Sequence, residues 1–179
     1  MLFIVVLACG ESLVLPAPVV PSDTLLLREW IPLQVDRSVG KAERFDSQGC
    51  LRQAPNTWLW VHDPLLRRAA DPWLYLNGRW EDQAWFCLTE SQRWRLQQAV
   101  RSLPPAQAQG FPQRTPLVLR FSAQVDGQLR SAAVPLGQED RHPDTVELVA
   151  LLSSLAAEGV WGLSPEGPEG DAEASLLGP

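Results

Sequence analysis

The chain has 179 residues, a hydrophobic content of 45% and a formal net charge of −6, which leaves room for one domain of about 130 to 140 residues between its two ends. Four acidic residues near the C-terminus supply most of that charge (Glu166, Glu169, Asp171 and Glu173). The rest has no basic field to attract phosphate groups, so we expect no nucleic-acid partner. No stretch approaches the roughly 20 apolar residues that a membrane-spanning helix requires.

The N-terminal segment joins an apolar run to a cysteine. Residues 2–8 are apolar and lead into Cys9, which is followed by the more polar residues 10–12. A short apolar core that ends at a small residue is typical of an export signal. Because a cysteine stands at the cleavage position, Val6-Leu7-Ala8-Cys9 resembles the lipobox of bacterial lipoproteins. The resemblance implies that residues 1–8 are a signal peptide and that Cys9 becomes the lipidated first residue.

The resemblance also implies a location. Gly10 stands where, in the enterobacterial system that this leader resembles, an Asp retains lipoproteins at the inner membrane. We therefore expect a lipid anchor in the cell envelope, on the periplasmic face of the outer membrane. Two alternatives stay open: another kind of export signal, or a cytosolic domain in which residues 3–8 form a buried first strand.

Three cysteines are an odd number for an exported protein. If Cys9 carries lipid, Cys50 and Cys87 remain as a pair, and such pairs normally form a disulfide in an oxidising compartment. We predict that disulfide. The alternative is two separate buried thiols.

Both ends of the chain differ in composition from its middle. Residues 9–26 contain three prolines and no sustained periodicity, which predicts an extended tether behind the lipid. Residues 164–179 consist largely of Gly, Pro and acidic residues and bury too little apolar surface to offset their ordering entropy. We expect a disordered acidic tail there and a single domain over residues 27–163.

Within that domain the pattern predicts strands, a helix, a hairpin and a second helix. Strands are expected at residues 28–35, on both sides of the turn cluster 46–49, and at residues 57–62, 73–80 and 84–88. The clearest element is a hairpin over residues 117–136. Its Asp126-Gly127 turn places Phe121 opposite Ala132 and Leu119 opposite Val134.

The first helix begins at Thr89, which forms a capping box with Gln92. It buries a stripe at helical spacing, made of Leu96, Ala99, Val100 and Leu103. Trp94 projects about 200° away from that stripe. A last helix begins at Asp144 or Thr145 and buries Leu148, Leu151, Leu152 and Leu155. The expected class is α+β, with an antiparallel sheet of about five to seven strands and two helices on one face.

This order of elements is similar to that of the emfourin family, small α+β proteins that inhibit thermolysin-like metalloproteases. The residues that carry the likeness are Leu88-Thr89-Glu90, Leu96, Val125-Asp126-Gly127-Gln128 and Asp144 through Leu155. The resemblance implies a protease as one candidate partner. A protruding segment such as residues 62–72 or 104–116 would then contact the protease.

The sequence lacks the patterns of a catalytic or metal site. His62 and His142 do not have the close spacing of zinc ligands, and no phosphate-binding loop or nucleophile motif occurs. A nucleophilic pair of Cys87 and His62 is the one arrangement to consider, but Cys87 lies in an apolar strand pattern that favours an inert thiol. We expect no catalysis, no metal and no cofactor.

Tryptophan is the residue type that stands out. Six of the eight tryptophans fall within 37 residues, namely Trp58, Trp60, Trp73, Trp80, Trp85 and Trp94. Most of these rings are expected in the core, with Trp73, Trp80 and Trp94 exposed to bind a partner. The functional prediction is a non-catalytic envelope lipoprotein that binds another envelope protein. The alternatives are an emfourin-like inhibitor and a carbohydrate or peptidoglycan binder with an aromatic platform.

Overall fold

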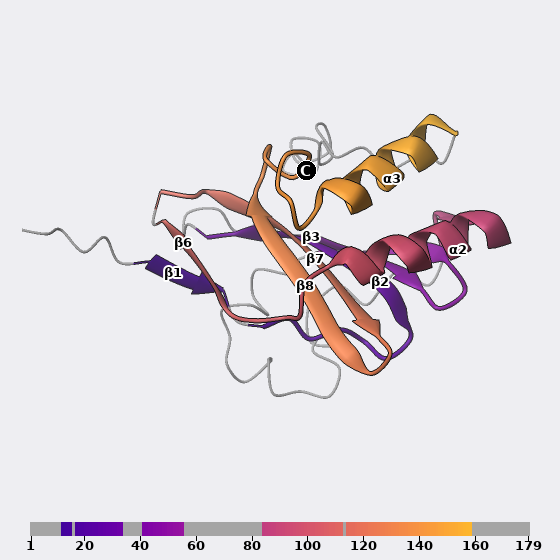
Figure 1. The fold of residues 1–179 in the computed structure, drawn as a ribbon, viewed down its shortest axis with the longest axis horizontal. Coiled ribbons are helices and arrows are strands. Elements are labelled where there is room, and N and C mark those ends of the chain that lie inside the picture. The colour runs from indigo at the N-terminus through magenta and orange to yellow at the C-terminus, as the bar shows by residue number, and fades with distance from the viewer. Residues whose placement is uncertain (1–11, 16, 34–40, 56–83, 113, 159–179) are drawn as a thin grey trace, which may run out of the picture.

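A computed structural model describes residues 12–15, 17–33, 41–55, 84–112 and 114–158. A six-stranded antiparallel sheet carries two helices, and a separate two-stranded sheet lies at one end (Figure 1). The predicted α+β class is therefore confirmed. No helix in the described ranges has the length and apolar character needed to cross a membrane.

The larger sheet has the strand order β5-β4-β3-β2-β7-β8, and β1 pairs with β6 in the smaller one. The strands are β1 (Ser12–Leu15), β2 (Thr24–Pro32), β3 (Lys41–Asp46), β4 (Cys50–Pro55), β5 (Phe86–Cys87), β6 (Gln109–Pro112), β7 (Leu117–Val125) and β8 (Gln128–Pro135). The helices are α2 (Glu90–Ala99), which continues into a short 3-10 turn at Val100–Ser102, and α3 (Val146–Ala157). The strands predicted at 57–62 and 73–80, the leader 1–8 and the tail 164–179 lie outside the described residues.

Turn chemistry fixes both predicted hairpins. At the β7–β8 turn, Asp126 and Gly127 have φ values of 51° and 75°, the left-handed conformation that a two-residue hairpin turn requires. The resulting register pairs Phe121 with Ala132 and Leu119 with Val134, as predicted.

Between β3 and β4, the carboxylate of Asp46 accepts hydrogen bonds from the backbone N–H groups of Gln48 (3.0 Å) and Cys50 (2.9 Å). Gly49 completes this turn with a φ of 80°. The turn predicted at residues 46–49 is confirmed.

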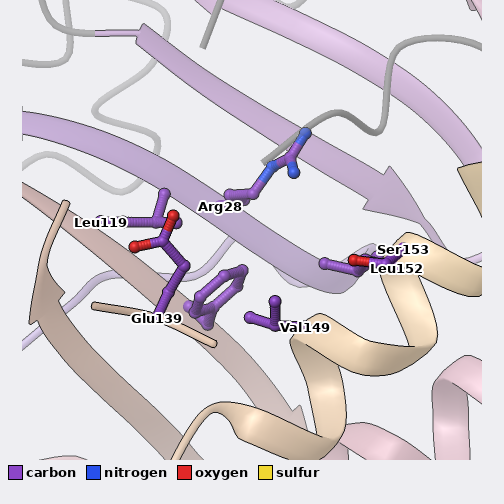
Figure 2. A pocket seen from close by; sticks show the side chains of 7 residues that line it. Arg28, Leu119, Glu139, Val149, Leu152 and Ser153 are labelled. Carbon is purple, nitrogen blue, oxygen red and sulfur yellow. The ribbon is translucent and has the colours of Figure 1, made fainter. Parts of the chain in front are cut away.

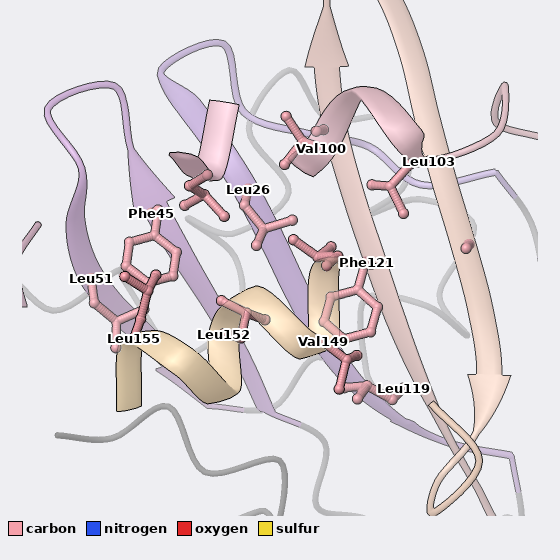
Figure 3. Close-up of a cluster of buried hydrophobic side chains, with 14 of the residues drawn as sticks. Leu26, Phe45, Leu51, Val100, Leu103, Leu119, Phe121, Val149, Leu152 and Leu155 are labelled. Carbon is pink, nitrogen blue, oxygen red and sulfur yellow. The ribbon is translucent and has the colours of Figure 1, made fainter. Parts of the chain in front are cut away.

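The helices cover one face of the sheet, where most of the large apolar side chains meet (Figure 3). The strands contribute Leu26, Phe45, Leu51 and Phe121 to this core. The helical side contributes Val100, Leu103, Leu152 and Leu155. In α3 the fully buried set includes Val149, whereas Leu151 is only partly buried. The predicted stripe was wrong at that position, because the side of α3 that is buried against the core consists of residues 148, 149, 152 and 155.

The opposite face of the sheet is also buried, which the sequence did not suggest. Leu27, Ile31 and Val118 pack there against Leu15 of β1 and Phe111 of β6. The prediction of a tether over residues 9–26 is wrong for residues 12–15 and 24–26, which form β1 and the start of β2. The apolar side chains of this segment cover sheet surface that would otherwise face water, and that burial offsets the cost of ordering them.

Burial on both faces places charged side chains inside the protein. On the helix face, Arg28 binds the buried carboxylate of Glu43, which also accepts from Lys41 Nζ at 2.7 Å and from Gln53 Nε2 at 2.9 Å. Both cations lie 4.5 Å from the centroid of the Trp30 ring. On the other face, Arg120 donates to Glu29 at 2.6 Å, and both side chains are fully buried.

We predict that Glu43→Gln destabilises the fold by about 3 kcal/mol or more, because it leaves two cations without their shared buried counter-charge. Urea denaturation measures the change. Asp126→Asn is the matched control, since the Arg101–Asp126 pair is exposed and removing such a pair costs about 1 kcal/mol or less. Equal effects of the two substitutions would contradict the role assigned to Glu43.

We further predict that Leu15→Ala costs about 2–5 kcal/mol, the usual range for a leucine truncated in a core. The neighbouring substitution Val14→Ala should be nearly neutral, because Val14 is exposed. Thermal melts of the two variants compare them directly. If Leu15→Ala melts like the unchanged protein, the segment is a tether after all.

Candidate partner-binding surface

Helix α2 forms where the sequence predicts it, and the reason is its N-terminal cap. The Gln92 backbone N–H donates to Thr89 Oγ1 at 3.3 Å, and the Thr89 N–H donates to Gln92 Oε1 at 3.0 Å. These bonds satisfy two donors that an uncapped helix would leave unpaired. Leu96, Val100 and Leu103 then point into the core.

Trp94 lies on the outward side of α2, and 60% of its surface is exposed. The residues one turn before and after it are all polar and exposed: Glu90, Ser91, Gln97 and Gln98. On α2, a large aromatic ring therefore stands among hydrophilic, exposed neighbours. Among the predicted partner-binding residues, Trp94 is where the helical spacing places it, whereas Trp73 and Trp80 lie outside the described residues.

A set of polar contacts with α3 fixes the orientation of α2. Arg95 donates to Glu158 at 2.6 Å and to Ser154 Oγ at 3.0 Å, and Gln92 Nε2 donates to the other Glu158 oxygen at 3.1 Å. The hydrogen bond from Arg95, followed by that from Gln92, holds the pKa of the Glu158 carboxyl below its ordinary value. These contacts lie on the side of α2 that faces α3, so Trp94 is held in a fixed direction.

Cys50 and Cys87 form the predicted disulfide. They face each other in the register of β4 and β5, with their Cα atoms 3.9 Å apart. The bond fastens the two-residue strand β5 to the sheet directly before α2 begins.

Trp85, next to this disulfide, has 55% of its surface exposed. Its backbone N–H donates to the Leu51 carbonyl at 2.9 Å. It was not among the rings expected to be exposed, because β5 has only two residues and its sequence shows no periodicity from which exposure could be judged. Trp85 and Trp94 are thus displayed by different elements.

A small pocket opens between α3 and the sheet (Figure 2). Its lining comes from three parts of the fold. Helix α3 provides Val149, Leu152 and Ser153, the strands provide Leu119 and Arg28, and the loop before α3 provides Glu139. Arg28 is already bound to Glu43, and Glu139 accepts from the Gly137 N–H at 2.6 Å. Since the space holds about one water molecule, the pocket is a packing defect rather than a ligand site.

The segment 104–116, named above as a protease-contacting loop, follows the edge of β8. The Pro104 carbonyl accepts from the Ser131 N–H, and the Ala106 N–H donates to the Leu129 carbonyl, both at 2.9 Å. Gln109 Oε1 accepts from the Ala133 N–H at 2.8 Å, and β6 follows. Residues 104–112 are thus bound to β8 and β1 and do not protrude as expected. Residues 62–72 lie outside the described part of the chain.

Within the described residues, no group of three or more His, Cys, Asp or Glu side chains has an arrangement that could hold a metal ion. No protein-family model, curated protein or solved structure matches the chain. Among the described residues, the exposed surface of α2 around Trp94 is the feature that indicates a function.

The contacts of Glu158 predict a response to acid. Because its pKa is lower in the folded state, the stabilisation is complete above the ordinary glutamate value of 4.5 and is lost as the pH falls through the lower folded value. Glu158→Gln should therefore melt at a lower temperature than the unchanged protein at pH 7, and the difference should shrink toward pH 3. Melting curves across that range test this, and a constant difference would refute it.

Proposed function

We propose that this protein is a non-catalytic, lipid-anchored protein of the cell envelope that binds another protein through the surface of α2 around Trp94. The observation that carries the binding proposal is the exposure of this ring on a helix that the core and α3 hold in place. Tryptophan supplies a large contact area at little entropic cost, and it is enriched among the residues that dominate binding energy. Its polar neighbours fit the hydrated rim that surrounds such an anchor.

The disulfide supports the proposed location in the cell envelope. Disulfides persist in oxidising compartments and are rare in the bacterial cytosol. With Cys50 and Cys87 bonded to each other, Cys9 is the remaining cysteine of the chain, and it stands at the end of the export-like apolar run. A lipidated Cys9 accounts for all three cysteines, whereas the cytosolic alternative leaves the disulfide unexplained.

The proposed partner is another envelope protein. The emfourin-like order of elements makes a protease a reasonable first candidate, and the capped start of α2 and the Asp126-Gly127 hairpin are among the features of that likeness. Trp94, however, belongs to no motif of that family that we identify. The proposal of protein binding therefore stands independently of the resemblance.

We predict that Trp94→Ala weakens binding of the partner by about 2 kcal/mol or more, as expected for an anchor residue. The melting temperature should hardly change, because the ring packs little. The partner is first recovered from envelope extracts with the full chain, and binding curves are then measured for each variant.

Gln98→Ala, on the same helical face, is the matched control and should bind normally. Binding of the partner by Trp85→Ala shows whether the second exposed ring, on a different element, also contributes to the contact. A lower melting temperature with unchanged binding in Trp94→Ala would assign this residue to the packing of the domain and remove it from the binding surface.

We also predict that Cys9 is lipidated. A single acyl chain gives marginal membrane binding, whereas the several chains of a mature lipoprotein anchor it stably. A palmitate analogue should label the unchanged protein and leave Cys9→Ser unlabelled. Equal labelling of both proteins would disprove the anchor, and the binding experiment on Trp94 would be unaffected by that outcome.

A further inference from the structure

The two-stranded sheet β1–β6 has an outward face without charge. Leu15 and Phe111 turn inward to the second core cluster. Because side chains alternate along a strand, Val14 points outward, and 67% of its surface is exposed. Its partner in the register is Gly110, and Pro112 lies on the same outward face of β6; both are exposed.

The sequence around this face carries little charge, although the whole chain has a net charge of −6, and its one acidic residue is Glu11, directly before β1. Residues 12–20 carry no charge at all, and residues 104–116 carry one, the exposed Arg114. Bacterial envelope membranes contain anionic lipids, which repel carboxylates and attract arginine. Glu11 and Arg114 balance each other, so this end of the protein has no net charge for an anionic bilayer to repel.

Covalent geometry limits how far this face can lie from a lipid on Cys9. Ser12, the first residue of β1, follows Cys9 by three positions. A chain extends at most about 3.3–3.6 Å per residue, so the two Cα atoms are within about 11 Å of each other in any conformation. That is not much more than the thickness of one lipid headgroup layer, about 5–8 Å.

We propose that the outward face of β1–β6, formed by Val14, Gly110 and Pro112, rests on the phospholipid bilayer to which Cys9 is anchored. The inference depends on the proposed lipid anchor and adds to it an orientation of the domain. The short chain between Cys9 and β1 keeps this face close to the bilayer. The face is apolar and uncharged, so contact with the lipid interface leaves no buried charge.

The test supplies the anchor chemically. In the oxidised full chain Cys9 is the sole cysteine outside the disulfide, so it can be coupled to maleimide-phosphatidylethanolamine in vesicles of phosphatidylethanolamine and phosphatidylglycerol. Hydrogen exchange measured by mass spectrometry should be several-fold slower at residues 12–15 and 109–112 than in protein whose Cys9 is blocked with N-ethylmaleimide. Exchange in α2 serves as the internal reference and should not change.

Val14→Asp should restore fast exchange in the coupled protein, because it places a carboxylate against the lipid. Val146→Asp is the matched control at another exposed valine and should keep the slow exchange. Equal exchange in coupled and blocked protein, or slow exchange that survives Val14→Asp, would overturn the proposal. Because the coupling does not use the cell's lipidation, this result is independent of the palmitate labelling of Cys9.

Discussion

The structure depends on the burial of both faces of strand β2. Leu26 and Trp30 face the helices, while Leu27 and Ile31 face the layer that contains β1 and β6. A polar side chain on this strand has no route to solvent, so each charge needs a partner inside the protein. Arg28 finds Glu43 on β3, and Glu29 finds Arg120 on β7.

These two pairs constrain the neighbouring strands. Arg28 lies opposite Glu43 and Glu29 lies opposite Arg120 in the observed registers. A slip by one residue would move each partner to the other face of the sheet and leave buried charges without compensation. The ion pairs therefore favour one register at the centre of the sheet, where apolar contacts alone tolerate more variation.

The sequence predicted correctly those elements that are determined by interactions between residues close together in the chain. The Asp126-Gly127 turn sets the β7–β8 register, and the Thr89–Gln92 capping box sets the start of α2, because each acts within four residues. Helical spacing also placed Trp94 correctly. Trp85 was missed, since β5 has only two residues and shows no periodicity from which to judge its faces.

The second buried layer could not be read from the sequence for a different reason. Arg120 and Ser122 alternate with apolar residues along β7, a pattern typical of a solvent-facing side, yet both are buried. Part of this face is covered by β1, which pairs with β6 almost a hundred positions away. Local periodicity carries no information about such a partner. The same pairing explains why a proline-containing segment with few local signals was interpreted as a tether.

The arrangement separates the two surfaces proposed to act. In Figure 1, β1 and β6 lie at one end of the long axis of the molecule, and α2 lies toward the other end. A domain held to a bilayer by its β1–β6 end would therefore display Trp94 away from the lipid. The cap at Thr89, the core below Leu96 and the contacts of Arg95 with α3 fix that ring before any partner arrives. Because binding then orders little that was mobile, most of the contact energy of one exposed ring is available for affinity.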